Sequence, residues 1–292
     1  MNERRLQAFL EVARAGSVKG AAERLVVTQP AVSATIRALE RDLGVRLVAP
    51  AGRGLMLTAA GEVLARHAAQ VLGLMDQTRW AVREAAEPGR GRLRLVAVTT
   101  AGEYVLPPIL TTFRARNPDV GIVLEVGNRR LVWERLRDHG ADVAIGGRPP
   151  PDGRFTGTPF RRNDLVVVGP ASFDVARPRL SPADVGEATW LLREPGSGTR
   201  STAEEWFGQA GLSPRTLTIG SNGAIVQSVA VGLGVTLISH DAVRRELEAG
   251  TIQILPMAGL PLRRHWHVVT RKDGEVPGAV GLFLDHVSAS VI

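Results

Sequence analysis

One segment of this chain combines the residue types that bind a small anion. Residues 193–200, with the sequence REPGSGTR, follow an apolar stretch that predicts a strand and open a pattern that predicts a helix. The first backbone N–H groups of a helix and the positive end of its dipole favour negative charge. The hydroxyl groups of Ser197 and Thr199 add hydrogen-bond donors. We therefore predict that Ser197, Gly198, Thr199 and Arg200 contact a ligand.

Two further helix starts repeat this design. Thr99 and Thr100 follow a predicted strand at residues 93–98, and Asn222 follows a short strand that ends at Ile219. Each start, taken singly, is typical of simple helix capping. Together they favour a common ligand cleft, because ligands of open α/β sheets bind at the carboxyl ends of the strands. With Arg148 and Arg200 nearby, the expected ligand is a small anionic molecule.

A second group of polar side chains shares one face of a predicted helix at residues 29–43. Gln29, Ser33 and Arg37 recur at every fourth position, with Pro30 on the same side. Amide, hydroxyl and guanidinium groups suit base edges and phosphates in a DNA major groove. Any amphipathic helix has a polar face, but here a short helix and a tight turn precede it. That order is the helix-turn-helix arrangement.

The elements that position this face are three short helices. The first ends at Gly16, the second begins after the N-cap Ser17, and the third begins after the N-cap Thr28 and ends at Gly44. These are residue types that start and stop helices. The third helix should pack on the first two through an apolar face formed by Val32, Ile36, Leu39 and Leu43.

Two β-prone pieces follow, at residues 45–48 and 55–58, and the Pro/Gly-rich turn 49–54 joins them. They predict a β-wing with Arg53 at its tip. Arg53 would reach a minor groove or a phosphate, although an exposed loop arginine is an equal alternative.

From Thr58 a long helical pattern runs without interruption to Pro88. Its positions 57, 61, 64, 68, 71, 75, 78 and 82 alternate steps of four and three, which is a heptad seam. A lone helix of this length should pair with a second copy of the chain. The alternative is that it packs on its own C-terminal domain. Residues 87–91 read as the linker that follows.

The rest of the chain alternates strands and helices, which predicts an α/β domain with largely parallel sheets covered on both sides. A break near Phe160 suggests two lobes with a cleft between them. The predicted strands are 93–98, 120–126, 142–146, 164–168, 189–192, 217–219, 234–238 and 265–270. The predicted helices are 104–116, 131–139, 198–210, 222–231, 241–249 and 276–287.

These patterns divide the chain into three parts. They are an N-terminal all-α winged helix-turn-helix domain (1–58), a dimerisation helix with its hinge (59–90), and a two-lobed effector-binding domain (91–292). Within the last part, lobe 1 comprises residues 91–160 and 266–292, and lobe 2 comprises residues 161–265.

Catalytic and metal motifs are absent from the sequence. Neither lysine precedes Ser or Thr, so there is no P-loop, and there is no cysteine. Gly232-Leu233-Gly234 runs from a helix into a strand, the wrong order for a dinucleotide site. Pro195 stands where a nucleophile elbow needs glycine. His265 and His267 share a strand face without a third metal ligand at suitable spacing. We expect no enzyme, no cofactor and no metal.

Charge and composition agree with a DNA partner. The 292 residues carry 36 Lys+Arg and 29 Asp+Glu, a net +7. Residues 1–60 hold 9 of the cations and 5 of the anions, a net +4, so this fifth of the chain carries more than half of the excess. A basic module suggests a polyanion partner, and random arginine scatter is an equal alternative on this count. The N-terminus lacks a signal peptide's apolar stretch, and we expect a cytoplasmic protein.

In this order of parts, the chain resembles the LysR-type transcriptional regulators. The resemblance covers essentially the whole chain, and its most specific stretch runs through FLEVA (9–13), Gly16-Ser17, TQPAVS (28–33) and Leu43-Gly44 to Leu57-Thr58 and Gly61. The family usually has Phe where Val48 stands and Arg where Pro50 stands. The DNA-contacting positions that the resemblance implies are Gln29, Pro30, Ser33, Arg37 and Arg53.

The resemblance also implies an effector site and partners. The effector site would include Thr99, Thr100, Asn128, the turn 197–200 and Asn222. Tyr104 and the 193–200 segment are similar to members that control carbon-fixation or sulfur-assimilation operons. The implied partners are operator DNA, a small anionic effector and RNA polymerase, and the chain itself would form a homodimer or homotetramer. The alternative function is a metabolite-sensing or solute-binding protein whose N-terminal module binds another protein.

Overall fold

The computed structural model describes residues 1–292 except 53, 88–90, 176–177, 273–277 and 290–292. The predicted wing-tip contact of Arg53 therefore lies outside the described residues. The chain forms two compact units. One comprises residues 1–86 with 137–140, and the other comprises residues 87–136 with 141–292.

The first unit begins with the three expected helices, α1 (Glu3–Ala15), α2 (Val18–Leu25) and α3 (Gln29–Leu43). The Ser17 hydroxyl accepts a hydrogen bond from the Gly20 N–H at 3.1 Å, and the Thr28 hydroxyl accepts one from the Ala31 N–H at 3.4 Å. Both predicted N-caps are thus confirmed. Gly16 and Gly44 end their helices in the left-handed conformation, with φ of 60° and 69°.

A small apolar core holds these helices together. Val32, Ile36 and Leu39 of α3 are buried, as predicted, against residues of α1 and α2 such as Phe9. Leu43 was expected to join them, but it is 42% exposed. Its place in the last turn of α3, directly before the cap, leaves it outside this core.

The wing consists of β1 (Val48–Ala51) and β2 (Gly54–Leu57), paired antiparallel. The strands extend further toward the tip than predicted, because Pro50 lies inside β1, opposite Leu55. A two-stranded ribbon has only edge strands, where proline is tolerated. The ribbon is fixed to the helices by the Leu55 N–H, which donates to the Gly16 carbonyl at 2.7 Å.

The long helix α4 (Ala59–Ala86) packs on the unit's own α1 over its first half. Gly61 approaches the Leu47 carbonyl so closely that a Cβ would lie 2.0 Å from its oxygen. Ala68 is buried against Leu6 and Leu10. The helix was expected to pair with a second copy or to pack on its own C-terminal domain, but its first half packs on the N-terminal helix α1 instead. Further along, several apolar side chains are 37–65% exposed, namely Val71, Leu74, Met75 and Val82.

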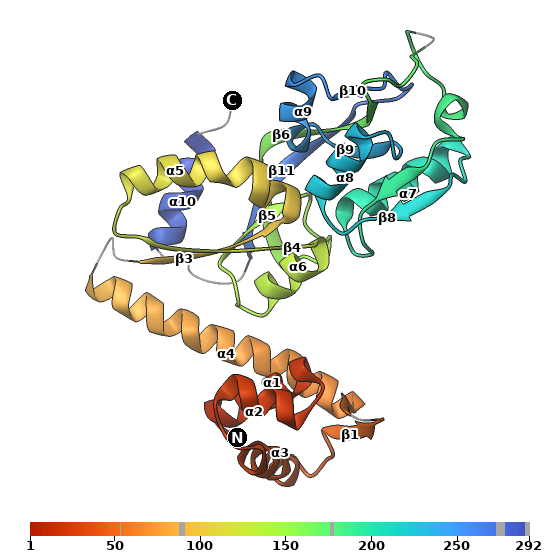
Figure 1. Cartoon of the computed structure of the whole chain (residues 1–292). Coiled ribbons are helices and arrows are strands. Elements are labelled where there is room, and N and C mark those ends of the chain that lie inside the picture. The colour runs from red at the N-terminus through yellow and green to blue at the C-terminus, as the bar shows by residue number, and fades with distance from the viewer. Residues whose placement is uncertain (53, 88–90, 176–177, 273–277, 290–292) are drawn as a thin grey trace. The chain divides into compact units, whose positions relative to one another are not determined.

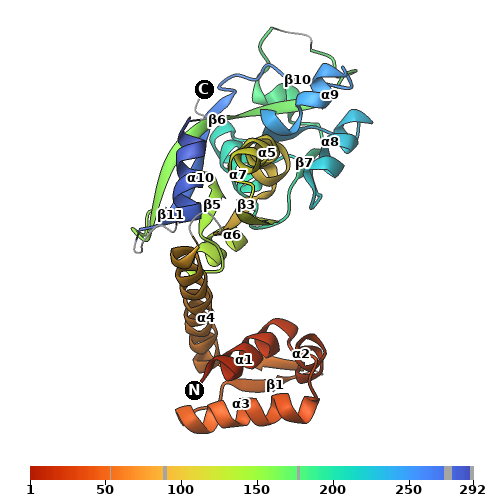
Figure 2. The same ribbon diagram turned by 90° about the vertical axis from the view of Figure 1, so that its left-hand side faces the viewer.

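Lobe 1 of the second unit is a sheet covered on both faces (Figures 1 and 2). Its parallel strands are β3 (Arg92–Val98), β4 (Gly121–Gly127) and β5 (Val143–Gly146). Its helices are the π-helical η1 (Ala101–Val105), α5 (Leu106–Arg116), α6 (Arg129–Arg137) and α10 (Gly278–Ala289). Alternate side chains of β3 pack on α5 and α10 on one face and on α6 on the other.

Two long antiparallel strands, β6 (Phe155–Pro170) and β11 (Leu262–Arg271), connect lobe 1 to lobe 2. The sheet order is β10-β6-β11-β5-β3-β4, where β10 comprises Ile252–Ile254, and β9 (Thr236–Ser239) also pairs with β6. The expectation of largely parallel sheets is therefore wrong, because these crossing strands pair antiparallel with their neighbours. No break occurs at Phe160, which lies within β6. The first part of β6, FTGTPFRRN, lacks the apolar alternation that would have revealed it.

Lobe 2 packs its helices on short strands. The strands are β7 (Trp190–Leu192), β8 (Thr216–Thr218), β9 (Thr236–Ser239) and β10 (Ile252–Ile254). The helices are η2 (Pro182–Val185), α7 (Gly198–Ala210), α8 (Asn222–Ala230), η3 (His240–Ala242) and α9 (Arg244–Glu248). Trp190 is fully buried against Trp206 and Phe207 of α7. The bounds of α7 are those predicted, whereas β10 and η2 were not expected.

Candidate DNA-contacting helix and ligand cavity

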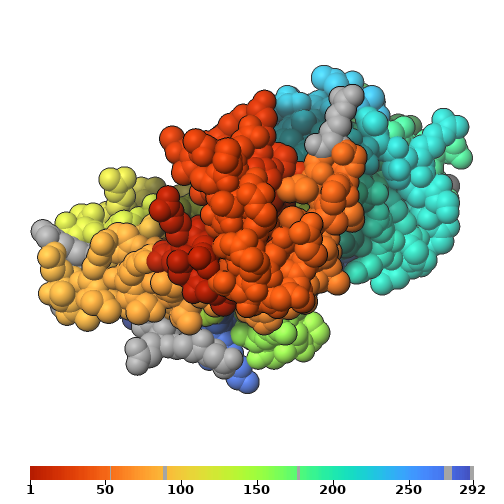
Figure 3. Space-filling model, turned by 90° about the horizontal axis from the view of Figure 1, so that it is seen from below, coloured from red at the N-terminus to blue at the C-terminus, as the bar shows by residue number. Residues whose placement is uncertain are grey.

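The predicted DNA-contacting residues that the structure describes lie on the outer side of α3. Gln29, Pro30 and Arg37 are exposed and Ser33 is half-buried, while the apolar face of the helix is covered. Figure 3 shows one face of this unit in red and orange. No carboxylate in the described part of the chain pairs with Arg37. Its guanidinium is therefore available to a phosphate or a base edge.

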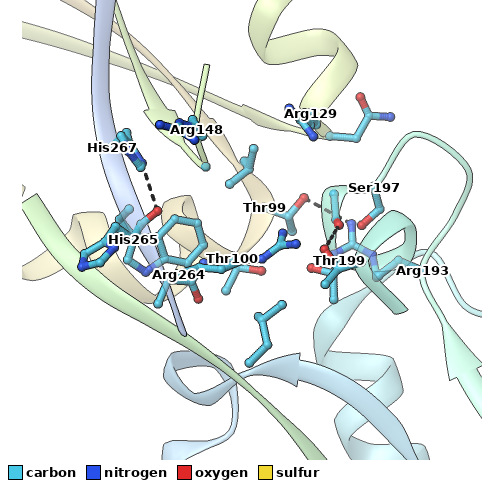
Figure 4. Close-up of a pocket in the computed structure, with 18 of the residues that line it drawn as sticks. Thr99, Thr100, Arg129, Arg148, Arg193, Ser197, Thr199, Arg264, His265 and His267 are labelled. Carbon is cyan, nitrogen blue, oxygen red and sulfur yellow. Dashed lines mark hydrogen bonds between the residues drawn. The ribbon is translucent and has the colours of Figure 1, made fainter. Parts of the chain in front are cut away.

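The second unit contains a cavity of about 570 Å³ between its lobes. Figure 4 shows Thr199, Ser197 and Arg193 on one side and Arg264, His265 and His267 on the other. Of the nine residues predicted to bind the effector, seven line the cavity: Thr99, Thr100, Asn128, Arg148, Ser197, Gly198 and Thr199. Their contact with a ligand remains a prediction.

The cavity is positively charged. Its lining holds five arginines and two histidines, namely Arg129, Arg148, Arg193, Arg263, Arg264, His265 and His267. No aspartate or glutamate is among the described residues that line it. Arg129 and Arg148 are exposed and form no ion pair within the described ranges. Such a lining attracts an anion and repels a cation.

The start of α7 contributes hydrogen-bond donors. Ser197, the N-cap, makes no side-chain capping bond, so the first N–H groups of the helix are not satisfied in that way. At α8, in contrast, the Ser221 hydroxyl accepts from the Ala224 N–H at 3.4 Å. Of these two predicted anion-binding helix starts, only α8 has a backbone N–H that donates to its N-cap side chain.

A hydrogen-bond network connects the lobes at the cavity wall. The side chain of Arg193, 5% exposed, donates from Nη1 to Asn222 Oδ1 at 2.6 Å and from Nη2 to Thr99 Oγ1 at 3.3 Å. Asn222 Nδ2 in turn donates to Thr100 Oγ1 at 3.0 Å. Thr99 and Thr100 follow β3 of lobe 1, whereas the other two residues belong to lobe 2. The network therefore links the two walls that a ligand would contact.

Two residues predicted to bind the effector do not line this cavity. Asn222, 1% exposed, lies behind Arg193 and supports it. Arg200 is turned away, because its Nε donates to Glu204 one helical turn further along at 2.7 Å and its Nη1 donates to the Arg193 carbonyl at 3.1 Å. Asn222 and Arg200 therefore both contact Arg193, a residue of the cavity wall, without lining the cavity themselves.

Most of the cationic lining was not predicted from the sequence. Arg193 lay inside the anion-binding segment but was not singled out, although it is the buried arginine of the site. The crossing strand β11 supplies Arg263, Arg264, His265 and His267. The two histidines were considered only as a metal pair, and the described residues contain no group of three or more potential metal ligands.

The position of His267 depends on an irregularity in the strand. The pairing of β11 with β6 shifts register between Trp266 and His267. Burial lowers the pKa of His267 below its ordinary value, and the neighbouring positive charges of His265 and Arg148 act in the same direction. A hydrogen bond between its Nδ1 and the His265 carbonyl, 3.1 Å apart, partly offsets this. The surroundings of His267 thus disfavour the protonated imidazolium.

Comparison with known families separates the chain into two matching regions. Residues 4–62 match the profile described as "Bacterial regulatory helix-turn-helix protein, lysR family". Residues 86–291 match the profile described as "LysR substrate binding domain". In the described part of the chain, no helix has the length and apolar character needed to cross a membrane.

Individual relatives agree with these matches. The RuBisCO operon transcriptional regulator of Acidithiobacillus ferrooxidans is 34% identical over 98% of this chain and 93% of its own length. The regulatory domain of CcmR from Synechocystis PCC6803, solved in complex with 2-PG, is 29% identical with a TM-score of 0.65, covering 68% of this chain and 97% of that domain. The crystal structure of CbnR, a LysR family transcriptional regulator, has a TM-score of 0.72 at 24% identity and covers 100% of both chains, which shows the shared fold.

Proposed function

Because this chain belongs to the LysR family of transcriptional regulators, with a DNA-binding domain and an effector-binding domain, we propose that a small anion in the interlobe cavity controls its action on DNA. The observation that carries this proposal is the cavity lining, with five arginines, no described carboxylate and the uncapped start of α7. No site for catalysis is proposed.

The similar proteins support a narrower class of ligand. One relative is named as a regulator of a RuBisCO operon, and one structural neighbour was solved with 2-PG, which is 2-phosphoglycolate. A short metabolite that carries phosphate or carboxylate groups fits the size and charge of the cavity described above. Genes of carbon fixation are the corresponding proposed targets.

The proposed control acts through the angle between the lobes. Residues of both lobes and of β11 line the cavity, so a ligand contacts all three at once. A ligand shifts an equilibrium between conformations only by binding one of them more tightly. Bridging contacts are of that kind, because they are complete only when the lobes are close together.

A homodimer or homotetramer and a contact with RNA polymerase belong to the same proposal. The exposed apolar side chains on the second half of α4 support the pairing of two chains. The contact with RNA polymerase rests on family membership alone. A function in binding another protein through the N-terminal module finds no comparable support, since residues 4–62 match a helix-turn-helix family.

Thermal unfolding of the full chain with sulfate, phosphate and 2-phosphoglycolate tests the proposal. A ligand at a hundred times its Kd stabilises a protein by about 2.7 kcal/mol, which raises Tm by several degrees. We expect such a shift with at least one anion, and we expect Arg148→Ala to abolish it.

Arg114→Ala is the matched control, because Arg114 is exposed on α5 and does not line the cavity. It removes the same charge and should keep the full shift. A shift that is equal in both variants would mean that the anion binds elsewhere, and the absence of any shift would contradict the proposed function.

A further inference from the structure

The guanidinium of Arg193 is almost fully committed to partners inside the protein. An arginine has five N–H donors. In the described structure, Nε donates to Glu194 Oε2 at 2.8 Å, and Nη2 donates to Glu194 Oε1 at 3.0 Å. The bonds to Asn222 and Thr99 use two more donors. A single N–H, on Nη1, is left for a ligand.

Glu194 holds the edge of this arginine that best recognises an oxyanion. Two parallel N–H···O bonds from Nε and Nη2 form the bidentate pair with which arginine binds a carboxylate or a phosphate. Glu194 forms that pair here. Among the described residues, the other groups bonded to this guanidinium are a neutral amide and a neutral hydroxyl.

The two side chains of this pair differ in their surroundings. Arg193 lines the cavity and its side chain is 5% exposed, whereas Glu194 is absent from the lining and its side chain is 30% exposed. The carboxylate can therefore become hydrated when it leaves the guanidinium, provided that another anion takes its place on the buried arginine. The arginine cannot follow, because Asn222 holds it from behind.

We propose that Glu194 is a built-in competitor for the ligand, which an incoming oxyanion displaces from Arg193. This inference rests on the proposed function and extends it. The exchange keeps the buried guanidinium paired with an anion throughout, which avoids an uncompensated buried charge. Glu194 thus raises the ligand concentration needed for a response, and it selects anions with two oxygens that can replace its own.

Titration calorimetry with 2-phosphoglycolate, sulfate and chloride tests the proposal on the full chain. Glu194→Gln removes the competing charge with little change in shape. We expect it to bind 2-phosphoglycolate about tenfold more tightly than the unaltered chain does, the ratio that corresponds to one charge-assisted hydrogen bond that need not be displaced. Chloride, which has no pair of oxygens, should show no such gain.

Glu204→Gln is the matched control. Glu204 is also paired with an arginine, Arg200 at 2.7 Å, and the substitution removes the same charge outside the cavity lining. It should leave the affinity unchanged. An equal gain in both variants would show a general effect of charge and would overturn the inference.

Two further variants keep the proposal testable if Glu194→Gln does not fold. Glu194→Asp shortens the side chain and weakens the bidentate pair, so it should give a smaller gain in affinity. Arg193→Gln should weaken binding, and in that background Glu194→Asp should bring no gain.

If the unaltered chain binds an oxyanion and the Glu194 variants bind it equally or more weakly, the inference is wrong and the proposed function stands. If the folded chain and its variants bind no anion at all, the proposed function fails as well.

Discussion

At the scale of single residues, the chemistry of the cavity depends on which polar groups are already satisfied. Arg193 and Arg148 both line it, but Arg193 is engaged by a carboxylate, whereas Arg148 has no described ion-pair partner. The Thr100 hydroxyl accepts from Asn222 and retains its own proton to donate. The two arginines, Arg193 and Arg148, should therefore respond differently to the same ligand.

We predict that His267 makes the binding of an anionic ligand depend on pH. Its depressed pKa leaves the imidazole neutral in the free protein at neutral pH. A bound anion would favour the imidazolium and raise that pKa, so binding takes up a proton. We therefore expect the affinity for 2-phosphoglycolate to increase as the pH falls from about 8 to about 6. Calorimetry in buffers of different ionisation enthalpy measures the proton uptake.

The folding stability of the unliganded protein should decrease as the pH falls, whereas its affinity for the ligand should increase. Because the folded pKa of His267 lies below the unfolded value, its contribution to stability is present above the unfolded pKa and is lost as the pH falls through the folded pKa. In His267→Gln, the proton uptake on binding should be reduced. Release of protons by the unaltered chain would contradict this assignment.

At the scale of elements, caps decide what a helix end can do. The starts of α2 and α3 are closed by Ser17 and Thr28, which fixes the two helices of the DNA-binding motif. The start of α7 has no side-chain cap and lies at the cavity. A helix start thus serves stability in the first unit, and in the proposed ligand site of the second unit it would serve recognition.

The outer face of α3 leads to a prediction about DNA affinity. Arg37→Ala should weaken binding to an operator selected from random duplexes, and the slope of log affinity against log salt should decrease by about one if Arg37 contacts a phosphate. Because Arg37 is exposed, its loss should not affect folding. Titrations at several salt concentrations measure both quantities.

Arg66→Ala is the control for this measurement, since Arg66 is exposed on α4 and also loses one charge. It should leave the salt slope almost unchanged. If Arg37→Ala binds the operator as tightly as the unaltered chain at matched salt, α3 does not use this residue on DNA.

For the whole molecule, the apolar side chains that are exposed along α4 bear on how copies of the chain associate. Val71, at the middle of α4, and Leu74 and Val82 further along are 44%, 50% and 65% exposed. A contiguous apolar stripe on a helix is typical of an association surface. The proposed occupant is α4 of a second chain.

We predict that Val71→Glu shifts the protein toward the monomer. A carboxylate in an apolar helix pair loses its hydration without gaining a partner, which weakens the dimer by several kcal/mol (order of magnitude). Sedimentation equilibrium across a range of concentrations measures the change. Arg66→Glu places a carboxylate elsewhere on α4 and should leave the dimer intact, whereas equal dissociation of both variants would count against this surface.

Features that depend on local interactions could be predicted from the sequence. Ser17, Thr28 and Gly44 mark helix ends because capping involves residues only a few positions apart. The segment 193–200 and the start of α7 were identified for the same reason. Much of the helical unit and five cavity residues, namely Thr99, Thr100, Ser197, Gly198 and Thr199, followed from such signals. Asn128 was implied by the family resemblance instead.

Which of these residues lie close together depends on how distant segments of the chain pack. The crossing strands β6 and β11 carry little local periodicity, and their pairing joins residues about 100 positions apart, such as Leu165 and Leu262. Their pairing brings Arg264 and His267 to the cavity and makes the sheet mixed. Burial likewise placed Asn222 behind Arg193 and turned Arg200 away. The positions of these side chains depend on packing and on which hydrogen-bond partners are available, and neither can be derived from the spacing of residues in the sequence.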